Sequence, residues 1–300
     1  MRKTKEGYLK VDEIHKIHWV EYGNPEGKPV LIFHGGPGSQ FKKRHASNKD
    51  KYRIIGFDQR GCGKSLPSGE IKNNTTQDLL RDADKLLDYL KIDKINLFGS
   101  SWGSTMALLY AEHNPLRVAS VFVSAVFLAR KKDDEWLYNG VKSIYPDYYE
   151  KFIKNIPENK RDNIAEYLLE IIEKGSFQKQ GETALAISNY EYSLMLVNPE
   201  KEEFSNEASE EDIAASKIFL HYSKNDYFLS EKEQILNNLH KIKDIPITIV
   251  HGRFDMCCPL EGAYSLHKGL KKSKLIISDG ENHISPKNSK ILNEEINKNL

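Results

Sequence analysis

Short apolar runs and helical patterns alternate along the first part of the chain. Six runs have the length and residue types of strands, the first two pairing as a hairpin: 8–11, 14–22, 30–33, 52–57, 95–98 and 118–126. Leucine and alanine recur every three or four positions over 79–90, which predicts an amphipathic helix whose N-cap is Thr75 or Thr76. A second helix is expected over about 104–113, ending before Pro115. Such alternation is typical of a mostly parallel sheet with helices on both faces.

This alternation stops near residue 127 and returns near residue 242. The segment between them has a mostly helical pattern and is rich in aromatic and charged residues. After it, a strand, a helix, a strand and a final helix are predicted at 247–250, about 260–270, 275–277 and from about 286. We therefore expect an α/β core domain, formed by 1–127 and 242–300, that is interrupted by a helical cap domain at 128–241.

Composition and charge exclude several classes of function. Of the 300 residues, 39% are hydrophobic and 29% are charged, which is close to the globular average and excludes a disordered chain. Lys and Arg number 44 against 43 Asp and Glu, so no net positive field is available for a nucleic-acid partner. The longest nearly apolar stretch, 118–129, is too short to cross a bilayer, so no membrane partner is expected.

Cysteine usage and the N-terminus favour a cytoplasmic location. The three cysteines, Cys62, Cys257 and Cys258, cannot build a disulfide framework, because two are adjacent and one is left over. The first six residues are mostly charged and lead into no apolar segment of the kind that a signal peptide needs. The sequence carries no signal for an oligomeric state.

The strongest chemical motif is Gly99-x-Ser101-x-Gly103, which lies between a predicted strand and a predicted helix. A tight turn with a glycine on either side presents the serine at the edge of the sheet, as a nucleophile requires. The start of the helix would place the backbone N–H of Trp102 beside a reacting carbonyl oxygen. A serine N-cap in a glycine-rich turn is the simpler alternative, but the flanking elements favour the nucleophile.

A serine nucleophile needs a general base and a carboxylate that orients the base. In this topology both follow later strands, with the acid first in the chain. Asp255 lies just beyond the strand at 247–250, and His283 lies just beyond the strand at 275–277. The rival acids and bases are Asp279, Glu281, His34, His221 and His251. We favour Asp255 because it has its own strand, and His283 because it alone follows a strand downstream of that acid.

A second glycine-rich turn, His34-Gly35-Gly36-Pro37-Gly38, follows an early apolar strand. Its glycines allow a substrate to approach the backbone, and one of its N–H groups can be a second oxyanion donor. An ordinary Gly/Pro turn is the alternative. The segment Gly61-Cys62-Gly63-Lys64-Ser65 is not a phosphate-binding P-loop, because Asp58 stands where that pattern needs a glycine. No metal-ligand spacing is recognisable, so we expect neither a metal nor a cofactor.

Together these motifs resemble those of the proline iminopeptidases (prolyl aminopeptidases) of the α/β-hydrolase superfamily. The matching motifs are H-G-G-P-G at 34–38, D-Q-R-G-x-G-x-S at 58–65, G-x-S-W-G-S at 99–104 and H-G-R-F-D at 251–255. They cover nearly the whole chain in order, and the match is weakest in the cap. The resemblance implies an α/β-hydrolase fold whose cap covers the site. It also implies a triad of Ser101, Asp255 and His283, an oxyanion hole at the backbone of Gly36 and Trp102, and a substrate contact at Gly35.

The resemblance further implies how substrate is held. Family members bind the N-terminal ammonium of a peptide with glutamates of the cap, since a buried cation needs carboxylates around it. The segment 187–192 resembles the family's Trp-Ser-x-Trp-Glu-Gly segment, so Glu191 fits one glutamate and Tyr190 replaces a flanking tryptophan as a substrate contact. The position of a second glutamate, two residues before a His-Tyr pair, holds Phe219. Asp226 or another cap acid is a candidate to replace it.

The leading hypothesis is therefore a cytoplasmic serine aminopeptidase that releases N-terminal residues, proline preferred, from short peptides through an acyl-enzyme. Two rivals stay open. An amidase or esterase of the same fold would not require a free amine, which would suit the apolar Phe219. A non-enzymatic binding protein would have kept the fold without its chemistry.

Overall fold

The predicted sheet is present in a computed structural model, which describes residues 4–43, 49–196, 205–231 and 233–300. Within these residues eight strands form one sheet in the order β1-β2-β4-β3-β5-β6-β7-β8. The strands are β1 Lys5–Lys10, β2 Lys16–Gly23, β3 Lys28–Phe33, β4 Tyr52–Phe57, β5 Ile95–Ser101, β6 Val118–Val126, β7 Ile247–Gly252 and β8 Ser273–Ser278. The β1–β2 hairpin is antiparallel, β2 also runs antiparallel to β4, and the strands from β4 to β8 are parallel. The predicted fold class is confirmed.

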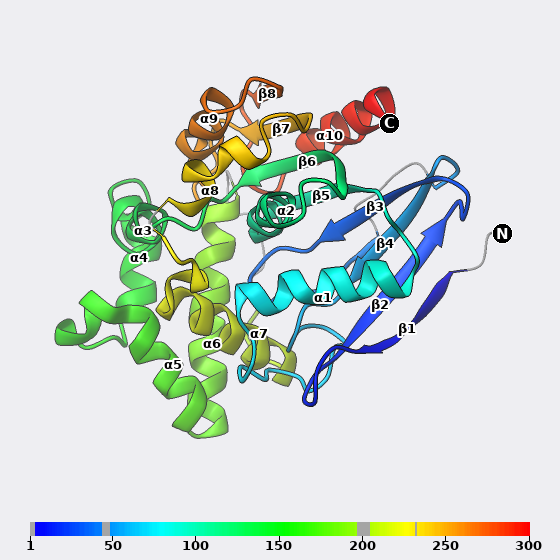
Figure 1. Cartoon of the computed structure of the whole chain (residues 1–300). Helices are drawn as coiled ribbons and strands as arrows, with labels where there is room; N and C mark the ends of the chain where they lie inside the picture. Colours follow the sequence, from blue (N-terminus) through cyan, green and yellow to red (C-terminus); the bar gives the residue numbers. More distant parts are fainter. Residues whose placement is uncertain (1–3, 44–48, 197–204, 232) are drawn as a thin grey trace.

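Helices cover both faces of this sheet (Figure 1). The α-helices of the described residues are α1 Thr76–Tyr89, α2 Trp102–His113, α3 Lys131–Glu135, α4 Pro146–Ile153, α5 Ile164–Lys174, α6 Phe177–Met195, α7 Glu210–Lys224, α8 Gln234–Asn237, α9 Leu260–Lys268 and α10 Pro286–Asn299. Alternate residues of β3 point to opposite faces. Leu31 packs in one hydrophobic cluster with α1, α2 and α9, and Ile32 packs in another with α10.

The start of α1 follows from its sequence. Thr75 is the N-cap, and its hydroxyl accepts a hydrogen bond from the backbone N–H of Asp78. The Asp78 carboxylate accepts in return from the Thr75 N–H at 3.1 Å, which completes a capping box. The apolar face of the helix is buried against the sheet, as the three-to-four spacing predicts.

Helices α3 to α7 follow β6 in the chain and lie together beside the sheet (Figure 1), and residues of α4 to α7 form most of a separate hydrophobic cluster. At its centre the rings of Phe152 and Tyr190 stack with centroids 4.4 Å apart. The division into a core of 1–127 and 242–300 and a cap of 128–241 stays a proposal, and Ile235 of α8 packs in the core's cluster. None of the described helices is long and apolar enough to cross a membrane.

Candidate active site

The chain turns from β5 into α2 at Ser101. Ser101 has φ 57° and ψ −130°, a strained backbone conformation for a residue other than glycine. The turn is possible because of the glycines on either side. A Cβ at Gly99 would collide with the carbonyl group of Gly103, and a Cβ at Gly103 would collide with the carbonyl group of Phe33. The local sequence therefore holds the Ser101 hydroxyl at the carboxyl edge of the sheet.

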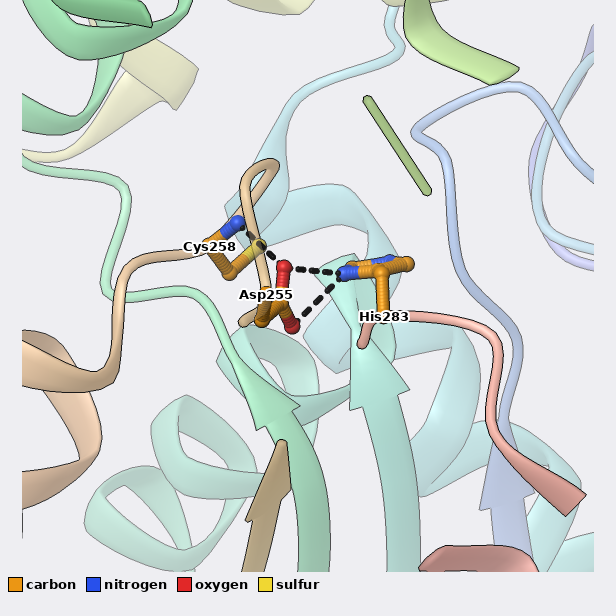
Figure 2. Close-up of side chains that lie close together, drawn as sticks. All are labelled: Asp255, Cys258 and His283. Atoms are coloured by element: carbon orange, nitrogen blue, oxygen red, sulfur yellow. Dashed lines mark hydrogen bonds and ion pairs between the residues drawn. The ribbon is translucent and has the colours of Figure 1, made fainter. Parts of the chain in front are cut away.

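Asp255 and His283 meet in the loops that follow β7 and β8 (Figure 2). The Nδ1 atom of His283 lies 2.9 Å from both carboxylate oxygens of Asp255. The same carboxylate accepts hydrogen bonds from the backbone N–H groups of Cys257 at 3.1 Å and Cys258 at 2.8 Å. An ionised carboxylate can only accept, so Nδ1 carries the proton and Nε2 is left as the basic nitrogen.

The rival acids and bases have other partners. Asp279 pairs with Arg253 on the surface, and a Glu281 oxygen accepts from the Ser285 hydroxyl at 2.6 Å. His251 is fully buried: its Nδ1 accepts from a backbone N–H at 3.0 Å and its Nε2 donates to a backbone carbonyl at 2.8 Å. His221 lies 3.0 Å from the carbonyl oxygen of Asn74. Both of these histidines therefore serve the packing of the fold.

Ser101 and His283 line one cleft of about 640 Å³, a volume in the usual range for small-ligand sites. The core contributes the nucleophile turn, the first glycine-rich turn and the loop after β8. The cap contributes one face of α6 and one face of α7. Among the residues that line the cleft, those relevant to function are Gly35, Gly36, Ser101, Glu191, Asp212, Phe219 and His283. The cleft thus lies between core and cap and combines a hydroxyl, an imidazole and carboxylates.

Glu191 reaches this cleft from α6, and its carboxylate makes no hydrogen bond or ion pair with any residue that the structure describes. Enclosure by protein raises the pKa of Glu191 to about 7, although the nearby His283 lowers it. Burial lowers the pKa of His283, but the charge and hydrogen bond of Asp255, together with Glu191, more than offset this and leave it above its usual value. Both cleft groups therefore have raised pKa values, and each influences the pKa of the other.

The predicted oxyanion donors flank Ser101. Gly36 has φ +113°, which favours glycine, and a Cβ at Gly35 would lie 3.6 Å from the Cβ of Ser101. Trp102 is the first residue of α2, so its backbone N–H belongs to the helix turn that has no intrahelical acceptor. These placements suit an oxyanion hole formed by the backbone of Gly36 and Trp102.

Gln59 is a residue of this site that sequence reasoning missed. Its side-chain oxygen accepts from the Trp102 indole N–H at 2.9 Å, and its side-chain nitrogen donates to the His34 carbonyl at 3.0 Å. Its backbone N–H donates to Nε2 of His34 at 3.0 Å. Burial lowers the pKa of His34, which keeps this nitrogen available as an acceptor. Gln59 therefore ties the first glycine-rich turn to the nucleophile turn; its position directly after β4, in the D-Q-R-G motif, was the available signal.

Two predicted cap contacts lie elsewhere. Tyr190 is buried, its hydroxyl donates to the Leu137 carbonyl at 2.8 Å, and it is not among the residues that line the cleft. Asp226 is also not among those residues. The cap acid that joins Glu191 in lining the cleft is Asp212, near the start of α7, and Phe219 lines the cleft as an apolar side chain.

Asp255, Cys258 and His283 also form the one group among the described residues with a spacing that could hold a metal ion, their ligand atoms lying within 4.8 Å of one another (Figure 2). A metal here would have to compete with the hydrogen bond between His283 and Asp255. It would also need the Cys258 thiolate, and burial raises the pKa of that thiol well above its usual value. This grouping therefore fits an oriented acid and base better than a metal centre.

Comparison with known sequences yields close relatives. Residues 28–288 match the family model described as the alpha/beta hydrolase fold. A proline iminopeptidase of Neisseria meningitidis serogroup B is 38% identical over 285 residues, which cover 93% of this chain and 91% of that protein. A proline iminopeptidase of Arabidopsis thaliana is 37% identical over 276 residues, which cover 90% of this chain and 73% of that protein.

Solved structures share the fold at lower identity. An alpha/beta hydrolase enzyme from a Medee basin deep-sea metagenome library superposes with a TM-score of 0.67 at 17% identity, covering 97% of both chains. An epoxide hydrolase from Vigna radiata has a TM-score of 0.63 at 18% identity, covering 98% of both chains. At such identities the likeness concerns the fold alone.

Proposed function

Because this chain belongs to the proline iminopeptidase family within the alpha/beta hydrolase fold, we propose that it is a serine aminopeptidase that releases N-terminal proline from short peptides. The single observation that carries the aminopeptidase assignment is Glu191. Its unpaired carboxylate lines the same cleft as Ser101 and His283. An enclosed carboxylate without a partner is unfavourable, and the ammonium group of a peptide N-terminus would supply the missing charge.

The proposed reaction follows the general course of serine hydrolysis. His283 accepts the Ser101 proton at Nε2 while Ser101 Oγ forms a bond to the scissile carbonyl carbon. The electron pair of the C=O bond moves onto the oxygen, where the backbone N–H groups of Gly36 and Trp102 stabilise it. Collapse of this intermediate breaks the C–N bond, and His283 gives its proton to the leaving amine. Water then attacks the acyl-enzyme by the same steps and releases the N-terminal residue.

Asp255 and Glu191 act on this reaction in different ways. Asp255 orients the imidazole and stabilises its protonated form, since it accepts the Nδ1 hydrogen bond. Glu191 contacts no reacting atom in this proposal and binds the free amine, which fixes how far the substrate enters the cleft. Cleavage would then be limited to the first peptide bond.

The test compares proline arylamide with its N-acetylated form. The free-amine substrate is expected to be cleaved with at least about 100-fold higher kcat/KM, since acetylation removes the charge that Glu191 binds and adds bulk. Ser101→Ala is expected to lose turnover while keeping its thermal unfolding transition. Equal cleavage of both substrates would refute the aminopeptidase assignment, and substantial activity in Ser101→Ala would refute the nucleophile.

A second candidate, an amidase or esterase without need of a free amine, is favoured by Phe219, which makes part of the cleft apolar. It predicts preference for the acetylated substrate in the same comparison. A fluorophosphonate probe separates either hydrolase from a non-enzymatic binding protein, because only an activated serine reacts. The free cysteines, all within the described residues, support the further proposal of a cytoplasmic location.

A further inference from the structure

A second cavity, of about 660 Å³, lies at the opposite edge of the sheet from the cleft. Its walls include residues at the amino ends of five parallel strands, β3 and β5 to β8, together with the last residues of α10. Asn96 of β5 lines this cavity, and Ser101 of the same strand lines the cleft. Five residues of extended strand separate them by roughly 16 Å, so the two sites are distinct.

The side chains that line this cavity are positively charged, and its lysines are exposed to solvent. Its sixteen lining residues include five lysines and no aspartate or glutamate side chain, in a chain whose acids and bases balance at 43 and 44. The lysines are Lys28, Lys94, Lys271, Lys272 and Lys274. Two of them have acidic partners outside the lining: Lys274 is 2.7 Å from Glu295, and Lys272 is 3.4 Å from Asp244. Lys28 and Lys271 make no ion pair with any described residue.

The floor of the cavity carries polar groups that are more than nine-tenths buried. The Ser120 hydroxyl donates to the Asn96 side-chain oxygen at 2.7 Å, and the Asn96 amide donates to a backbone carbonyl at 3.0 Å. Thr248 is 8% exposed, and its hydroxyl forms no hydrogen bond with any residue that the structure describes. The hydroxyl oxygen is open to the cavity, unlike the buried polar atoms that lack a partner elsewhere in the described residues, so Thr248 is suited to bind an oxygen of a ligand.

We propose that this lysine cavity, defined by the five lysines and Thr248, binds a small anion that carries more than one phosphate group. Lys28 starts β3, and three lysines lie around the start of β8, four strand spacings or about 19 Å away, so a single phosphate group cannot contact both ends of the cavity. Lysine ammonium groups bind phosphate oxygens as point charges, and the hydroxyl and amide groups of the floor add directional hydrogen bonds.

Calorimetric titration with inorganic tripolyphosphate tests the proposal at 0.15 M salt, where diffuse surface attraction is screened over about 8 Å. Saturable binding with one site per chain is expected. The double variant Lys28→Gln/Lys271→Gln should weaken binding by about tenfold or more, since it removes two unpaired charges. Thr248→Val preserves shape and should weaken binding several-fold through its lost hydrogen bond.

The matched control is Lys154→Gln/Lys160→Gln, which removes two exposed lysines from the cap and leaves the net charge equal to that of the cavity variant. It should bind tripolyphosphate as the unaltered protein does. Cleavage of proline arylamide without added anion should be unchanged in both double variants, which shows that both are folded. The proposal is overturned if no saturable binding occurs, if the control pair weakens binding as much as the cavity pair, or if citrate binds as tightly.

Discussion

The two sides of the candidate catalytic cleft hold their carboxylates in opposite ways. Behind the core wall, Asp255 does not line the cleft: it is fully buried and accepts hydrogen bonds from two backbone N–H groups and from His283. On the cap wall, Glu191 has no hydrogen bond or ion pair with a described residue, and its enclosure raises its pKa to about 7. The core wall is therefore electrostatically complete before substrate arrives, whereas the cap wall needs a cation.

Under the proposed function, this difference separates the group that assists the reaction from the group that binds the substrate. A carboxylate that already has its partners is preorganised and can orient His283 without rearrangement. A carboxylate that lacks partners is stabilised most when a cation binds, so the free energy of that pairing contributes to substrate binding. Substitutions on the two walls should accordingly change different kinetic constants.

The largest effect is expected on the core wall, from Asp255→Asn. The amide of asparagine can donate to Nδ1 and would favour the wrong tautomer of His283, so kcat should fall by about 10³–10⁴. Asp279→Asn is the matched control, because Asp279 pairs with Arg253 rather than with His283. Steady-state cleavage of proline arylamide measures both. A larger loss of kcat in Asp279→Asn than in Asp255→Asn would show that Asp279, and not Asp255, orients His283.

On the cap wall, Glu191→Gln should act on binding. It removes the charge that pairs with the substrate amine, so kcat/KM for proline arylamide should fall by about 10², mainly through KM. Cleavage of the N-acetylated substrate should not fall. Glu182→Gln, an exposed position on the same helix, is the control and should keep both activities. If KM stayed unchanged while kcat fell, Glu191 would belong with the catalytic groups and the distinction between the walls would fail.

The same variant gives a test by pH. Activity needs neutral His283, whose pKa lies above its usual value near 6.5, so as pH falls turnover should be lost at a higher pH than an unperturbed histidine would give. Glu191 is one cause of that rise. In Glu191→Gln the acid limb of the kcat profile should therefore move to lower pH, and an acid limb that moved upward would contradict the coupling between the walls.

Much of the core could be predicted from local sequence, because its signals act over a few residues. The capping box at Thr75, the glycines around Ser101 and the strand ends before Asp255 and His283 are signals of this kind. The cap could not be predicted as well, since the direction of a helix face depends on distant packing. Thus Tyr190 stacks on Phe152 inside the cap, although its neighbour Glu191 lines the cleft.

Two other features escaped prediction for the same reason. Gln59 acts through His34 and Trp102, which are 25 and 43 residues away in the chain. The lysine cavity combines a basic segment, 271–274, which supplies three of its five lysines, with Lys28 and Lys94 at the starts of other strands. The fold brings together residues that are far apart in the chain. A sequence motif covers only neighbouring residues and therefore does not show such groupings.

A smaller effect is expected within the core wall, from Gln59→Met. Methionine fills similar space but cannot join the Trp102 indole to the His34 carbonyl, so the two turns that carry the proposed oxyanion donors lose their link. We expect kcat to fall by about tenfold with KM little changed, since substrate binding on the cap wall is intact. A parallel rise in KM would indicate general disorder of the cleft instead of a positioning role. Thermal unfolding in parallel checks that the variant is folded.

The smallest effect on activity, and a reference for Glu191, is expected from Glu112→Gln. Glu112 on α2 is another enclosed glutamate: one of its oxygens has no partner among the described residues, and burial raises its pKa to about 8 although Lys241 lowers it. Glu112 does not line the cleft, so no substrate cation can pair with its carboxylate. The folded protein then holds a proton that the unfolded chain releases above about 4.5, and stability decreases as pH rises from there to about 8.

Glu112→Gln removes this penalty, so at pH 8 the free energy of unfolding should rise by on the order of 2 kcal/mol and the melting temperature by several degrees. At pH 4 the melting temperature should change little. Neither kcat nor KM should change. Glu191→Gln should also stabilise the protein near pH 8, but with the loss of binding described above. If Glu112→Gln impaired turnover as well, loss of activity on replacing an unpaired enclosed carboxylate would not identify a substrate site. The assignment of Glu191 would then lose its support. If only Glu191→Gln impairs turnover, what distinguishes the two acids is access to the cleft, because both have raised pKa values.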